Sequence, residues 1–386
     1  MHIAAKAASI AIALAALGGC STLQSLNPFA SKPVPRNPPA ALVDFKPSMN
    51  VKSAWTVNIG KAGAALFSPA LVGGNVFVAA ADGTLARLDA ATGSQVWRIN
   101  TGVPLTAGVG ADAGTVAVGA SGGMLLVYSA DGKQRWKAQA SSEILGAPAV
   151  AQGLVIVRSI DNRIVAFDAD SGVRRWQVQR NAPALALRSA PGMVIDSQSA
   201  YVAMPGGRMV ALALSNGGPR WEVAVGDPRG ATEPERIADV SGVPVLVGRE
   251  VCAVAYQGRL GCVDVSTGST RWAKEFSAEV GLGADERNVY GVDERGNVNA
   301  FTYDAGVSVW RNNTLANRRL AAPVAVGRAL AVGDYQGYMH FLSREDGAVL
   351  ARSATDGSQV IGTPVVNGNT VIFQTQAGTV AALTAE

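Results

Sequence analysis

An internal repeat of about 40 residues constrains this chain more than any other feature of its sequence. One copy runs from Asp82 to Trp97 and holds a turn at Gly83, a short alternating strand, a second turn and another strand. The first turn recurs eight times, at Gly83, Gly123, Asn162, Gly207, Gly258, Gly296, Gly337 and Gly378. Asn tolerates the left-handed turn conformation best after Gly, so Asn162 fits the series.

In six of seven copies the second turn is followed, four residues after its glycine, by a tryptophan. The positions are Trp97, Trp136, Trp176, Trp221, Trp272 and Trp310, with Ala351 in the seventh copy. A further β-branched strand pair precedes each copy, so one repeat holds four short strands, and the 3.6-residue period of a helical solenoid is absent. The sequence therefore predicts an all-β, eight-bladed β-propeller of four-stranded antiparallel blades, with tryptophan rings filling the wedges between blades.

The two ends of the repeat array complement each other. The last unit, residues 361–383, has only three strands, whereas Trp55 lies in a strand at residues 53–57 that has no blade in front of it. Pairing these segments completes the eighth blade and removes an open sheet edge. We therefore expect a propeller over residues 51–386 that is closed by its N-terminal strand.

The N-terminal segment has the pattern of an exported lipoprotein. Residues 10–17 are an apolar run too short to span a bilayer. The last residue of the run begins a Leu-Gly-Gly-Cys string, residues 17–20, that resembles a bacterial lipobox. The alternative is an ordinary signal peptide with a cysteine at its cleavage point. We expect a signal peptide over 1–19, a lipidated Cys20, and a Pro-rich tether over 20–50. Ser21, rather than Asp, follows the cysteine, which implies the outer membrane, facing the periplasm.

Charge and histidine content exclude several functions. The net charge of +4 falls to +3 when the signal leaves with Lys6, and no basic block interleaves with aromatics, so we expect no nucleic-acid partner. His2 leaves with the signal, and His340 is expected at a blade surface. A His-based acid–base pair and a multi-His metal site are therefore excluded. We predict no catalytic residue, no metal and no cofactor.

The repeat has a recognisable relative. The strings at residues 88–97 and 263–272 resemble the tryptophan-docking repeat of pyrroloquinoline-quinone dehydrogenases, which a non-catalytic family, the BamB lipoproteins, shares. The enzymes carry adjacent cysteines over the quinone, whereas Cys252 and Cys262 are ten residues apart here. With the lipobox, the tether and eight blades, the chain is more similar to BamB.

That resemblance implies a scaffold of the outer membrane β-barrel assembly machinery that aids insertion of outer membrane proteins. The implied partners are a BamA-like barrel insertase with its POTRA domains, the other lipoproteins of the machinery, and unfolded outer membrane protein clients. The alternatives are a quinone dehydrogenase, a sugar-binding periplasmic propeller, and a chaperone-like binder that takes extended clients on a blade edge by strand addition.

The two longest connections between blades follow Trp176 and Trp221, with inserts at 181–188 and 227–236. All such connections emerge on one face, because four strands return the chain to the same side, and long loops on a rigid scaffold commonly bind partners. In the first insert Leu185 and Leu187 alternate and Arg188 follows, a composition typical of protein interfaces. The alternative is that both leucines pack under the blade.

The BamB resemblance also implies site residues. In that family a Leu-x-Leu-Arg run and an Asp-Val-Asp run bind a POTRA domain. Leu185, Leu187 and Arg188 match the first run. Asp239 matches the start of the second, whereas Ser241 replaces its second carboxylate.

Two cysteines remain for pairing once Cys20 is lipidated. Cys252 and Cys262 flank one tight turn at equal distances from Gln257. In an oxidising compartment this spacing predicts a cross-strand disulfide.

Overall fold

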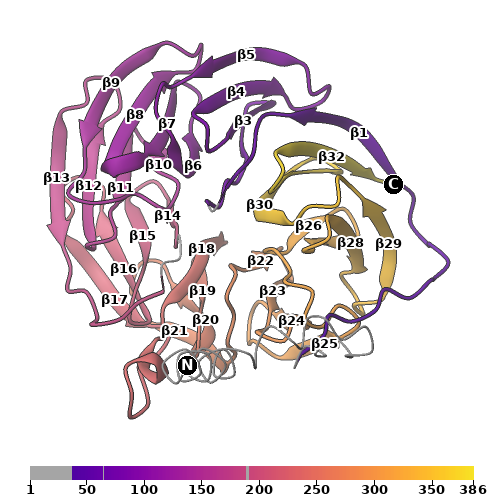
Figure 1. Cartoon of the computed structure of the whole chain (residues 1–386). Helices are drawn as coiled ribbons and strands as arrows, with labels where there is room; N and C mark the ends of the chain where they lie inside the picture. Colours follow the sequence, from indigo (N-terminus) through magenta and orange to yellow (C-terminus); the bar gives the residue numbers. More distant parts are fainter. Residues whose placement is uncertain (1–36, 64, 188–190) are drawn as a thin grey trace, which may run out of the picture. The chain divides into compact units, whose positions relative to one another are not determined.

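The computed structural model describes residues 37–63, 65–187 and 191–386. Its strands form eight four-stranded sheets arranged around one axis (Figure 1), so the prediction of an eight-bladed antiparallel propeller is confirmed. The predicted signal peptide and Cys20 lie outside the described residues. Within the described part of the chain, no helix is long and apolar enough to cross a membrane.

The blades follow one another along the chain, and each is named by its strands. They are β2 (Ala70–Val72), β3 (Asn75–Ala79), β4 (Thr84–Asp89) and β5 (Gln95–Asn100); β6 (Leu105–Ala111), β7 (Thr115–Ala120), β8 (Met124–Ser129) and β9 (Gln134–Gln139); β10 (Ala149–Ala151), β11 (Leu154–Arg158), β12 (Arg163–Asp168) and β13 (Arg174–Gln179); β14 (Met193–Ile195), β15 (Ser199–Met204), β16 (Arg208–Ala213) and β17 (Pro219–Ala224); β18 (Val240–Val247), β19 (Glu250–Ala255), β20 (Arg259–Asp264) and β21 (Thr270–Glu275); β22 (Gly283–Ala284), β23 (Asn288–Val292), β24 (Val298–Thr302) and β25 (Ser308–Asn312); β26 (Val324–Val326), β27 (Ala329–Gly333), β28 (Tyr338–Ser343) and β29 (Val349–Ala354); and β30 (Val360–Asn367), β31 (Thr370–Thr375), β32 (Thr379–Ala385) and β1 (Val51–Asn58). Two short 3-10 turns, η2 (Ser121–Gly123) and η3 (Pro234–Arg236), lie in loops.

The N-terminal strand closes the ring. β1 pairs antiparallel with β32, from Val51 opposite Ala385 to Asn58 opposite Thr379, and becomes the outermost strand of the last blade (Figure 1). The expected closure is therefore confirmed.

The tryptophans join neighbouring blades. The indole N–H of Trp272 donates to the carbonyl of Tyr303 in the next blade at 2.8 Å, and its ring covers Gly306. A Cβ added at Gly306 would lie 2.3 Å from that ring, and the residue has a φ of +63°. The same indole bond recurs at Trp55, Trp97, Trp136, Trp176, Trp221 and Trp310. The repeat glycines are thus required by the rings that pack on them.

The ring has two distinct faces. The connections between blades and the turns joining the second and third strands of each blade lie on one side, because every blade has four strands. We call this side the connector face and the other the opposite face.

Cys252 and Cys262 form a directly opposed pair on β19 and β20 and are joined as a disulfide, with their Cα atoms 4.0 Å apart. Both side chains are fully buried.

Part of the predicted tether belongs to the ring. The compact unit begins at Ala40 rather than at residue 51, and Leu42 and Met49 pack into two of its apolar clusters. The folded body therefore begins about ten residues earlier than the predicted boundary, since apolar side chains at 42 and 49 are covered by the blades.

Candidate partner-binding surface

The 181–191 loop starts beside the turn between β11 and β12, on the connector face. Asn162 in that turn has a φ of +62°, and its carbonyl accepts a hydrogen bond from the Arg180 N–H at 3.2 Å. Its side-chain amide donates to the carbonyl of Asn181 at 3.3 Å. The asparagine that interrupts the glycine series therefore holds the root of this loop.

Asp239 braces the far part of the loop from below. Its carboxylate accepts the Leu187 N–H at 2.6 Å and the Gly206 N–H at 2.8 Å, and only 1% of the residue is exposed. Asp239 is a predicted partner contact, and the structure places its carboxylate beneath the loop, where it holds the backbone of Leu187 and Gly206.

A buried cation, Arg158, stands near this carboxylate. It ends β11, is 9% exposed, and donates to Asn162 Oδ1 at 3.1 Å. Burial lowers the pKa of Arg158 to about 10, so it stays protonated at pH 7. Burial also raises the pKa of Asp239, and the backbone bonds from Gly206 and Leu187 and the charge of Arg158 oppose that shift.

Sequence reasoning missed Arg158. The available signal was a charged residue ending the otherwise apolar run 154–157. A charge in a strand that is buried along its length requires polar or charged partners. Here they are Asn162, in the turn, and the carboxylate of Asp239, beneath the loop.

The loop presents apolar side chains to solvent. Leu185 is 43% exposed and Leu187 is partly exposed, while Arg188 lies outside the described residues. Ile160, in the adjoining turn, is 42% exposed, and Val243, on β18, is 39% exposed. The hydrogen bond from Gly192 N–H to the Gly242 carbonyl, at 2.9 Å, brings β18 beside the end of the loop.

The second insert, 227–236, differs in character. It is polar and exposed and is ordered by its own contacts, in which Glu235 accepts the N–H groups of Ala231 and Thr232 at 2.8 and 3.1 Å. Ser241, whose role the family pattern left open, is buried and donates to the Ala278 carbonyl at 2.7 Å. Neither the 227–236 insert nor Ser241 adds an exposed large apolar side chain to the surface around Leu185.

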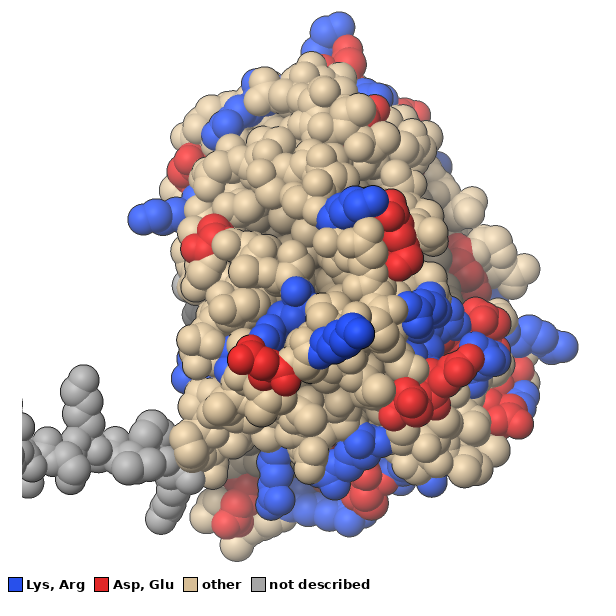
Figure 2. All heavy atoms as spheres, turned by 90° about the vertical axis from the view of Figure 1, so that its right-hand side faces the viewer, with Lys and Arg blue, Asp and Glu red and all other residues tan. Residues whose placement is uncertain are grey.

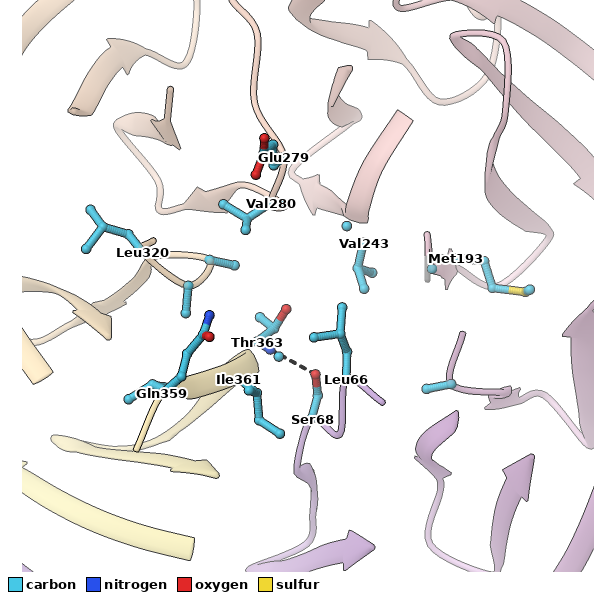
Figure 3. Close-up of a pocket in the computed structure, with 18 of the residues that line it drawn as sticks. Leu66, Ser68, Met193, Val243, Glu279, Val280, Leu320, Gln359, Ile361 and Thr363 are labelled. Atoms are coloured by element: carbon cyan, nitrogen blue, oxygen red, sulfur yellow. Dashed lines mark hydrogen bonds between the residues drawn. The ribbon is translucent and has the colours of Figure 1, made fainter. Parts of the chain in front are cut away.

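A cavity of about 200 Å³ lies on the axis of the ring (Figure 3). Leu66 and Val243 point into it, and the Thr363 N–H donates to Ser68 Oγ at 2.8 Å on its wall. Glu279 is the one carboxylate among its described lining residues. Most of the other described lining residues are apolar or glycine.

Charges are interspersed on the side of the ring shown in Figure 2. Basic and acidic side chains lie next to one another there, and no broad area carries one sign. A nucleic-acid surface would present a basic patch or stripe.

Comparison with known proteins gives a consistent assignment. The family model of the outer membrane protein assembly factor BamB matches residues 52–102, 81–312 and 294–386. The BamB of Burkholderia pseudomallei is 46% identical over 89% of this chain and 90% of its own length, and that of Bordetella pertussis is 40% identical over 97% and 95%.

Solved structures agree on the fold. The crystal structure of BamB from Moraxella catarrhalis superposes with a TM-score of 0.80 at 26% identity, covering 87% of this chain and all of the other. The quinohemoprotein alcohol dehydrogenase of Comamonas testosteroni has a TM-score of 0.67 at 16% identity, which reflects the shared propeller alone. The chain belongs to the BamB family of outer membrane protein assembly factors.

Proposed function

We propose that this protein is a non-catalytic scaffold of the β-barrel assembly machinery, which binds the POTRA region of a BamA-like insertase. The observation that carries the proposal is the 181–191 loop, where Leu185 stands exposed on a backbone that Asp239 fixes from beneath. Family membership supports the assembly role, and the surface chemistry supports protein binding.

A fixed apolar loop is well suited to binding a folded partner. Ordering a mobile segment on binding costs free energy, and residues 181–187, which are hydrogen-bonded at Asn181 and at Leu187, avoid most of that cost. Leu185 and Ile160 supply apolar anchors, and Arg188 follows in sequence as a charged edge. Apolar anchors with a polar rim are typical of interface hot spots.

We also propose that the protein is held at the outer membrane by acyl chains on Cys20, with the propeller in the periplasm. The Leu-Gly-Gly-Cys string after the apolar run supports this. The intact mass of protein extracted from membranes tests it: a mature N-terminus at Cys20 with added acyl mass is expected, and an unmodified terminus elsewhere would exclude it.

Binding is tested by changing the loop without disturbing the ring. In the triple variant Leu185→Ala, Leu187→Ala, Arg188→Ala, association with purified POTRA domains should become undetectable, since one anchor commonly contributes about 1–4 kcal/mol. The matched control is Val307→Ala with Val309→Ala, which removes two exposed valines, 56% and 43% exposed, far from the loop in sequence.

Thermal melting of the same proteins separates binding from folding. The triple variant should melt near the wild type, and the valine control should bind normally. A reference for core damage is Trp272→Ala, expected to lose about 3–5 kcal/mol of stability. If the triple variant melts normally and still binds, the partner site lies elsewhere. If it melts as early as the tryptophan variant, the leucines are core residues.

A further inference from the structure

We infer that residues 40–50 form a strap that carries the chain across the rim of the ring and fixes its exit on the connector face, the face of the 181–191 loop. The significance of that shared face rests on the proposed function. The strap itself rests on contacts of the folded ring.

The chain must cross the rim to reach the connector face, because β1 begins at the opposite face. Val51 pairs with Ala385 and Asn58 pairs with Thr379, and Thr379 directly follows the Gly378 turn on the connector face. The start of β1 therefore lies at the opposite face. Without further contacts, the chain preceding Val51 would leave the ring there.

Residues 48–43 run back along the edge strand β29. The Ser48 N–H donates to the Leu350 carbonyl at 3.0 Å, and Arg328, in the opposite-face turn between β26 and β27, donates to the Ser48 carbonyl at 2.6 Å. Further along, Arg352 donates to the Val43 carbonyl at 3.4 Å. The order of partners, Arg328, Leu350 and then Arg352, follows β29 toward the connector face.

Side chains of the strap add packing to these backbone bonds. The guanidinium of Arg352 lies over two rings, 5.4 Å from the centre of Phe45 and 5.6 Å from that of Tyr338. Leu42 packs against the apolar cluster that contains Leu315 and Leu320. Met49 packs into a second apolar cluster, which contains Ala351, the residue that holds the tryptophan position of the repeat on β29.

The end of the strap is held by a buried ionic cluster. Arg318 lies in the connection between β25 and β26 and donates to the Ala40 carbonyl at 2.9 Å, while the Ala40 N–H donates to the Ala316 carbonyl at 2.8 Å. Both bonds lie on the connector face.

Arg318 is itself fixed in place. It is 2% exposed, its Nε donates to Asp334 Oδ2 at 2.8 Å, and Asp334 also bonds His340 Nε2 at 3.0 Å. His340 is 1% exposed, so the expectation that it lies at a blade surface is wrong; it belongs to this cluster. Arg318 Nη1 donates to the Ala40 carbonyl, which lies on the strap and not on a blade. The buried guanidinium therefore holds the strap as well as pairing with Asp334.

Distances between spin labels test the strap in the full chain. One label is placed on the strap at Ala41→Cys, and the second either at Arg295→Cys, on the connector face, or at Asp304→Cys, on the opposite face of the same blade. The Arg295 carbonyl accepts the Asn317 N–H at 2.7 Å, beside Arg318, so the first pair should be close. The second pair should be longer by roughly 15 Å, the length of a five-residue strand.

The variant Leu42→Ser with Phe45→Ser changes two strap residues and no residue of a blade. It should broaden both distance distributions and remove the difference, while the melting temperature changes little. Arg318→Ala should do the same, with a lower melting temperature because the buried Asp334 loses its guanidinium partner.

Equal distances in the wild type, or a narrow, short Ala41–Arg295 distance in the strap variant, would overturn the inference. Neither readout depends on the lipid anchor or on the partner, so failure of the proposed function would leave it standing.

Discussion

At the scale of single residues, Asp239 shows how a predicted contact can act from beneath a surface. In Asp239→Ala the N–H groups of Leu187 and Gly206 lose their acceptor, each at about 1–3 kcal/mol if left unsatisfied. Because the bonds are only partly buried, we expect a total loss of roughly 2 kcal/mol. Hydrogen exchange of the Leu187 amide should accelerate before any global change. Unchanged exchange there would contradict the bracing role.

Asp264 gives the ring a defined acid sensitivity. The Ser266 hydroxyl and the N–H groups of Thr267 and Ser266 hold the pKa of Asp264 at about 2, below its usual value near 4. A lowered folded-state pKa stabilises the protein above the unfolded pKa, and that stability is lost as the pH falls from about 4 to about 2. The wild type should thus lose melting temperature faster over this range than Asp264→Asn. Parallel curves for the two proteins would refute this role.

At the scale of elements, the β19–β20 pair carries the disulfide. Thiol titration of unreduced, denatured protein should find no free sulfhydryl at Cys252 or Cys262. The closed loop is short, so the bond should contribute at most about 2–3 kcal/mol. Because both sulfurs are buried, a reductant should act only after unfolding, and Cys252→Ala with Cys262→Ala should melt identically with and without it. Two titratable thiols at these positions would contradict the bond.

The elements also show what sequence could and could not predict. Blade number, strand order and ring closure were predictable because each depends on a periodic signal, such as the turn at Gly306 beneath Trp272. The loop at Leu185 was found because it breaks that period. The roles of Arg158, Asp239 and Arg318 were not predictable, since each depends on partners brought together by the ring rather than by spacing along the chain.

At the scale of the whole molecule, the proposed anchor at Cys20 would make the strap determine which face of the ring is presented to the membrane. With the strap in place, residues 21–39 can span at most roughly 65 Å from Cys20 to the connector face. If it is released, residues 21–50 span up to roughly 100 Å and start from the opposite face. The anchored ring should therefore turn its connector face, and with it Leu185, toward the bilayer.

This orientation can be measured on vesicles that carry the lipidated protein and a lipid-bound quencher. A fluorophore at Arg295→Cys should be quenched more than one at Asp304→Cys, because the two positions lie on opposite ends of one blade. Leu42→Ser with Phe45→Ser should reduce that difference while the protein stays on the membrane. Equal quenching in the wild type would show that the strap does not orient the ring. Protein that fails to remain on the vesicles would count against the anchor at Cys20 and leave the strap unaffected.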